Sequence, residues 1–161
     1  GDFAQFLPHL LPGTLKSLKI DGEEVAAQLQ PGAGDDEDEE YVTVTTGDGK
    51  LMKVRSDRFE ALLQSVQLLH TYCSEMEGAF FDYIPQTAES LLPLLSTDEM
   101  PMLGDEARSM AFQTWAMLIK CAREGAAARG QQGGLANELL RTFLQRACAG
   151  MLQEQDPDTL Q

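Results

Sequence analysis

The chain begins with the pattern Gly1-x-Phe3-x-x-Phe6-Leu7-Pro8, which returns without gaps as Gly78-x-Phe80-x-x-Tyr83-Ile84-Pro85. We call this segment A. A second segment, B, also occurs twice, at an offset of 48 where the offset of A is 77. Its matching positions are Asp57 and Asp105, Leu62 and Met110, Leu63 and Ala111, Leu69 and Met117, and Cys73 and Cys121. The order along the chain is therefore A, B, A, B.

The two A-to-B connections differ in length, because the first occupies positions 20–55 and the second only positions 97–103. The first connection is longer than the second by the same number of residues by which the two offsets differ. One repeat therefore carries a long insertion. A helix pair that recurs every ~40 to 47 residues is typical of HEAT and armadillo solenoids, in which each pair buries its apolar face against its neighbours. The repeats therefore predict an all-α HEAT-repeat solenoid.

Apolar residues in every segment recur at steps of three and four, which places them on one face of an α-helix. The stripe of the first B segment consists of Phe59, Leu62, Leu63, Val66, Leu69, Tyr72, Cys73 and Met76. Pro85 and Pro93 predict kinks in the second A helix, because proline removes a backbone donor and crowds the preceding turn. The expected helices, about two and a half pairs, are 1–19 (A), 57–77 (B), 78–96 (A), 104–124 (B) and 134–154 (a third A).

The insertion, residues 20–56, begins with a stretch that carries only negative charge. Positions 21–40 hold nine acidic side chains and no basic one, within a net charge of −14 for the whole chain. Such a segment cannot bury enough apolar area to offset the entropy of ordering, so we expect a mobile acidic arm. The arm would attract basic peptides and repel nucleic acid and membrane phosphates; alternatively, it serves only solubility. Its densest run is Asp35, Asp36, Glu37, Asp38, Glu39 and Glu40.

Two alternating runs rich in β-branched residues follow the arm, at 41–45 and 51–54, with Gly47-Asp48-Gly49 between them. This pattern predicts a short β-hairpin. An isolated hairpin is only marginally stable, so it must either dock on the helices or stay mobile.

Patterns of catalysis and metal binding are missing from the sequence. His9 and His70 have no carboxylate or cysteine at ligand spacing, which favours surface or packing histidines over metal ligands. Cys73, Cys121 and Cys148 lie in or beside apolar stripes, where a thiol acts as a small buried hydrophobe, and their odd number favours a reducing compartment. No phosphate-binding loop, nucleophile elbow or transmembrane run of about 18 apolar residues occurs. We therefore predict a binding protein and no enzyme, with no cofactor and no metal.

The order of these features carries a family resemblance. An A helix that ends in a Leu-rich run precedes an Asp/Glu-dense insertion, then Tyr41-Val42-x-Val44, a Gly-Asp turn, and Lys53-Val54 before the B helix. Glu77-Gly78-x-Phe80-x-x-Tyr83 and Leu-Leu-Pro-Leu-Leu follow. Over essentially the whole chain this order resembles the central HEAT repeats of the importin beta-3 class of karyopherins.

The resemblance implies a fragment of a nuclear transport receptor that shuttles between cytoplasm and nucleus. Its cargo proteins would carry Lys/Arg-rich signals. Ran-GTP and Phe-Gly nucleoporins would bind through the full-length receptor, and no direct contact with nucleic acid or membrane is implied. A HEAT-repeat scaffold subunit of a phosphatase or chromatin complex would share the apolar stripes and is the alternative. A compact helical bundle is the third option, and the regular offset between the B segments counts against it.

The resemblance also implies that the B helices line the concave face of the superhelix, where polar positions off the stripe meet a partner. Together with the acidic run at 35–40, the candidate partner-binding residues are Asp57, Glu60, Gln64, Asp105, Glu106 and Gln113. For Asp57 and Asp105, a helix-capping role is the competing interpretation. Both ends of the segment should expose apolar stripes, so we expect end-to-end self-association through Leu7, Leu10, Leu11, Leu144 and Met151.

Overall fold

The computed structural model describes residues 2–19, 27–28, 41–45, 51–96, 99–100 and 103–154. Its α-helices are α1 (Leu7–Ser17), α2 (Ser56–Met76), α3 (Ile84–Leu91), α4 (Asp105–Ala128) and α5 (Gly134–Glu154). Three short 3₁₀-helices, η1 (Asp2–Gln5), η2 (Glu77–Tyr83) and η3 (Leu92–Leu95), and three strands, β1 (Ala27–Gln28), β2 (Tyr41–Thr45) and β3 (Leu51–Arg55), complete the described elements.

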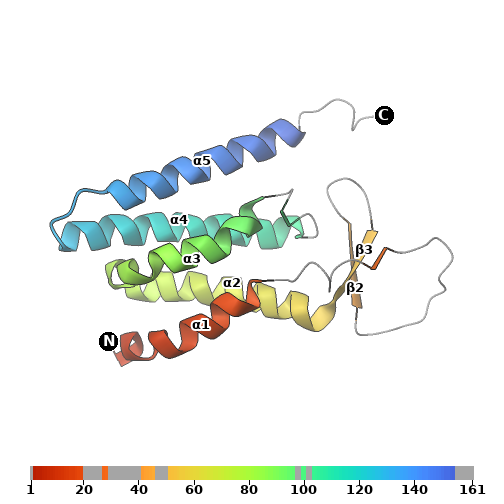
Figure 1. Ribbon diagram of the computed structural model, residues 1–161, viewed down its shortest axis with the longest axis horizontal. Helices are drawn as coiled ribbons and strands as arrows, with labels where there is room; N and C mark the ends of the chain where they lie inside the picture. The colour runs from red at the N-terminus through yellow and green to blue at the C-terminus, as the bar shows by residue number, and fades with distance from the viewer. Residues whose placement is uncertain are drawn as a thin grey trace.

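The helices form two layers (Figure 1). The A helices α1 and α3 lie in front, and the B helices α2 and α4 run parallel to each other behind them. α2 packs along α4, α1 packs on α2, and η2 and α3 pack on α4. α5 packs on α4 as the third A helix. The chain is thus an all-α HEAT-repeat solenoid of two helix pairs followed by a third A helix, as the repeats predicted.

One continuous core joins the two layers. The apolar stripes of the B helices are buried, with Leu69 and Cys73 of α2 and Leu118 and Cys121 of α4 all fully inaccessible to solvent. From the A layer, the largest fully buried side chains are Leu7, Leu11, Phe80, Ile84, Leu91 and Leu94. For the B helices, the three-and-four spacing in the sequence therefore identified the buried face correctly.

The second A segment departs from the expectation of one kinked helix over 78–96. It is divided into η2, α3 and η3, and Pro85 and Pro93 each occupy one of the first two positions of a new helix. Proline suits this place because the missing N–H would have no partner there, whereas within a helix it breaks the hydrogen-bond ladder. In the first A segment, Pro12 lies inside α1 and the helix continues through it.

The second B helix is longer than the expected range of 104–124, because it continues to Ala128. The added turn is rich in alanine, the strongest helix former, and the helix ends only where a glycine allows it. Gly130 has a φ of 64°, and the N–H of Gln131 donates to the carbonyl of Ala126 at 2.9 Å. This is the Schellman arrangement of a helix C-terminus.

The predicted hairpin is present within the insertion. β2 and β3 pair antiparallel, from Tyr41 opposite Arg55 to Thr45 opposite Leu51. β1 adds a third strand on the other edge of β3, which the sequence did not predict because two residues are too short to show alternation. The sheet lies at the N-terminal end of α2 (Figure 1). The acidic run at 35–40 lies outside the described residues.

Candidate partner-binding surfaces

The predicted polar positions on the B helices are all solvent-exposed. They are Asp57, Glu60 and Gln64 on α2 and Asp105, Glu106 and Gln113 on α4. Because α2 and α4 pack side by side in parallel (Figure 1), the four carboxylates lie near two neighbouring helix N-termini. The Gln113 amide donates to the Ser109 hydroxyl at 3.4 Å. This end of the B layer, next to the sheet, carries these four carboxylates together with Arg58 and Arg108; we call it the acidic end.

The capping interpretation fails for Asp105. The N-cap of α4 is Gly104, and Asp105 lies in the first turn of the helix. Asp57 also lies in the first turn, of α2, where its Oδ1 accepts from the N–H of Arg58 at 2.8 Å. First-turn carboxylates stabilise a helix through its dipole by about 0.3–1 kcal/mol each. The same dipoles reduce the negative potential that a basic partner would meet. Glu106 also lies in the first turn of α4, whereas Glu60 lies beyond the first turn of α2.

A charged residue that the sequence reasoning missed holds the second A-to-B connection in place. The Arg108 guanidinium donates to the carbonyls of Leu94, Met100 and Leu103 at 3.3, 2.9 and 3.1 Å. Burial lowers the pKa of Arg108, and nearby Asp105 opposes that shift. The repeat alignment gives no signal for this role, because the equivalent position in the first B segment is Glu60, of opposite charge.

Two of the cysteines meet at equivalent positions of the two B helices. Cys73 and Cys121 are fully buried, and the thiol of Cys121 donates to the carbonyl oxygen of Cys73 with 3.3 Å between sulfur and oxygen. The hydrogen bond with Cys121 and burial raise the pKa of Cys73. The hydrogen bond with Cys73 lowers the pKa of Cys121. Both thiols are nevertheless inaccessible to solvent, and an inaccessible thiol is unreactive, so these cysteines have the packing role that the sequence predicted. Cys148 is exposed, against expectation, because no described helix covers that side of α5.

Two of the five apolar residues predicted to be exposed at the ends are buried. Leu7 and Leu11 are buried, which corrects the expectation that they are exposed; they face the core, since α1 packs on α2. Leu10, Leu144 and Met151 are exposed by 45%, 52% and 57%. These three side chains remain available for self-association.

Replacing Leu144 with glutamate should therefore raise the dissociation constant of any end-to-end dimer about tenfold or more, since burial of one leucine contributes roughly 1.5–3 kcal/mol. Sedimentation velocity over a concentration series measures this. Gln145→Glu, at an exposed position on the same helix, introduces the same charge and should have a smaller effect. A wild-type chain that stays monomeric at high concentration would contradict the expected self-association.

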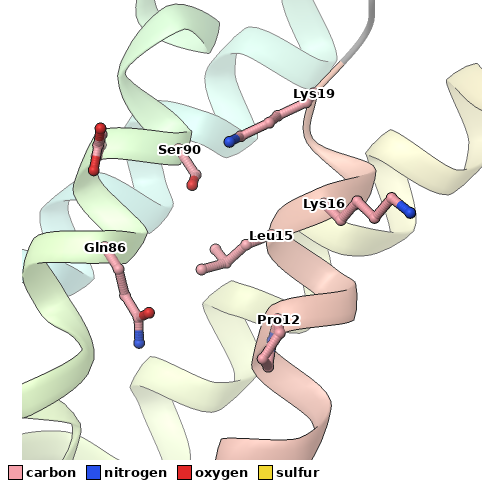
Figure 2. Close-up of a pocket in the computed structure, with 7 residues that line it drawn as sticks. Pro12, Leu15, Lys16, Lys19, Gln86 and Ser90 are labelled. Atoms are coloured by element: carbon pink, nitrogen blue, oxygen red, sulfur yellow. The ribbon is translucent and has the colours of Figure 1, made fainter.

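On the opposite layer, a groove lies between α1 and α3 (Figure 2). Its volume is about 450 Å³, and its walls are Pro12, Leu15, Lys16, Lys19, Gln86, Glu89 and Ser90. Lys19 extends from the end of α1 toward α3, and Leu15 points into the gap (Figure 2). Sequence patterns contain no signal for this groove, because its two walls belong to different repeats and meet only through tertiary packing.

Within the described part of the chain, no group of three or more His, Cys, Asp or Glu side chains is arranged to hold a metal ion. In the same residues, no helix combines the length and apolarity that a membrane crossing requires.

Comparison with known proteins gives a fold. No known family model and no curated protein sequence matches the chain. Among solved structures, a Kap121p chain that carries several substitutions matches with a TM-score of 0.70 and 21% identity. Kap121p bound to Nup53p matches with a TM-score of 0.68 and 22% identity. Each match covers 97% of this chain and 14% of the other. The chain thus has the fold of a short stretch of the helical HEAT-repeat solenoid of Kap121p, a karyopherin.

Proposed function

We propose that this chain is a segment of a nuclear transport receptor of the karyopherin class, related to importin beta-3. The receptor would bind the Lys/Arg-rich segments of cargo proteins. The observation that carries the proposal is the match of 97% of the chain to a stretch of the Kap121p solenoid. The order of acidic insertion, hairpin and B helix supports the importin beta-3 assignment. One matched Kap121p chain is bound to Nup53p, which supports a role in binding partner proteins.

In this proposal the full-length receptor binds Ran-GTP and Phe-Gly nucleoporins and shuttles between cytoplasm and nucleus. The segment itself has no catalytic role. Nothing in the helices, grooves or comparisons favours the alternative of a phosphatase or chromatin scaffold.

The acidic end of the B layer would receive the basic segment of the cargo. Exposed charge pairs contribute roughly 0–1 kcal/mol each, so affinity requires many of them acting together. Opposite charges across such a surface mainly increase the association rate and the specificity. Glu60 and Glu106 would make direct pairs with cargo lysines and arginines, and the acidic run at 35–40 would attract them from a distance.

The test is binding of a fluorescent Lys/Arg-rich peptide, measured by stopped-flow over a salt series. The double variant Glu60→Gln/Glu106→Gln should weaken binding about two- to tenfold at low salt, because two exposed charge pairs are lost. Replacement of residues 35–40 by Gly and Ser should lower the association rate at low salt and have little effect near 1 M salt, where the screening length is about 3 Å.

The matched control is Glu138→Gln, which removes one exposed carboxylate from α5 and should leave binding unchanged. Wild-type affinity in the double variant would reject the B-layer site. Identical salt slopes with and without the acidic run would reject the steering role of the arm while leaving the B-layer site in place.

A further inference from the structure

The groove between α1 and α3 is lined by three charged residues, Lys16, Lys19 and Glu89. Lys16 points away from the gap (Figure 2), which leaves one cation and one anion that do not pair. Lys19 and Glu89 line it from opposite walls, and both are exposed. Neither forms an ion pair with another described residue, whereas Lys120, Arg129 and Arg146 do so with carboxylates elsewhere. A lysine and a glutamate that face one gap without pairing can each bind an opposite charge placed between them.

Neither charge is required by the helical repeat. In the alignment of the two A segments, Lys19 is matched by Ser96 and Glu89 by Pro12. Lys19 follows the end of α1, where a cation is favourable to the helix dipole. Glu89 lies in α3, which continues directly into η3 at Leu92, so its carboxylate is not at a free helix end.

The other residues of the groove suit the backbone of a bound peptide. Gln86 and Ser90 on α3 each carry a donor and an acceptor, and Ser90 points into the gap (Figure 2). They can therefore bond to the C=O and N–H groups of an extended peptide. Leu15 and Pro12 on α1 provide an apolar wall. The volume of about 450 Å³ falls within the range of roughly 300–1,000 Å³ that binding pockets occupy.

We propose that this groove binds a short extended peptide that carries an acidic side chain for Lys19 and a basic side chain for Glu89. The two charges fix the direction of the peptide, because reversing it would place like charges together. The site lies on the A layer (Figure 1) and does not depend on the transport function proposed above.

The probe is a set of fluorescent Gly/Ser/Leu heptapeptides with one aspartate and one lysine, in both orders and with varied spacing between the two charges. Fluorescence anisotropy with the whole chain should show that one order and spacing binds best. Lys19→Ala and Glu89→Ala should each weaken that peptide about two- to fivefold, as expected for one exposed ion pair. The double variant Lys19→Glu/Glu89→Lys should prefer the opposite order.

The control is Arg141→Glu/Glu138→Lys, an equal exchange of two exposed charges on α5, which should keep the wild-type preference. Circular dichroism melting confirms that each variant is folded. The proposal is overturned if no charged peptide binds better than the uncharged one, if aspartate alone suffices, or if the exchange at positions 19 and 89 leaves the preferred order unchanged.

Discussion

Replacing Trp115 with alanine should lower the free energy of unfolding by about 3–5 kcal/mol, the usual loss for a buried tryptophan in a core. Trp115 is only 2% exposed, and its indole N–H donates to the carbonyl oxygen of Leu139 at 3.0 Å. It therefore joins α4 to α5. Because α5 packs chiefly on α4, the loss of stability should mainly weaken the packing of α5 against α4.

Urea unfolding followed by far-UV circular dichroism measures the effect. Trp115→Phe is the matched variant, since it keeps most of the apolar area and removes the hydrogen bond; a loss of about 1–2 kcal/mol is expected. Hydrogen exchange should show α5 amides losing protection before those of α2. If Trp115→Ala unfolds with the wild-type midpoint, Trp115 does not anchor α5.

The second large effect is expected at Gly125, where substitution by alanine should clearly lower the free energy of unfolding. A Cβ at this position would lie 2.6 Å from Cβ and Cδ2 of Phe81 and 2.8 Å from the carbonyl oxygen of Gly78. Overpacking of this kind costs about 1–3 kcal/mol or more. The gain in helix propensity, about 1 kcal/mol, offsets part of the loss. Because backbone lies on one side of the new methyl group, we expect the upper end of the overpacking range and a net loss of about 2 kcal/mol.

Gly150→Ala provides a control of opposite sign. Gly150 lies in α5, and a Cβ there would meet nothing within 4 Å, so the substitution should stabilise the chain by up to about 1 kcal/mol. Fluorescence of Trp115, the single tryptophan, follows unfolding of both variants in urea. Equal shifts in the same direction for Gly125→Ala and Gly150→Ala would contradict the close contact between η2 and α4.

The contact at Gly125 also explains the stacking of the second repeat. Gly78 and Gly125 approach so closely that a Cβ on Gly78 would lie 3.0 Å from the backbone nitrogen of Gly125. Arg129 closes the same contact, with its guanidinium 2.9 Å from the Asp82 carboxylate and 4.5 Å from the centre of the Phe81 ring. Glycine near a helix end usually indicates a helix stop, so its role as a packing contact was not visible in the sequence.

Local chemistry explains which parts could be predicted. Val66, Leu69 and Cys73 are buried because their spacing places them on one face of α2, and any partner helix would have to cover that face. The hairpin at 41–55 likewise follows from alternation around a Gly-rich turn. By contrast, Pro85 and Pro93 were expected to kink one helix, and instead each lies at the start of a new helix. A proline within an apolar stripe indicates a kink and a new helix start equally, so the sequence did not distinguish them.

The amino-acid sequence by itself determined the helical repeat, the order of A and B helices and the exposed acidic positions Glu60 and Glu106, since these depend on spacings within one or two turns. Only the tertiary structure decided that Leu7 and Leu11 are covered while Leu144 is not. It also decided that Lys19 and Glu89 face one groove. The physical reason is that burial and cross-groove charge depend on which helices stack and how closely, and this is decided by contacts between residues far apart in the chain.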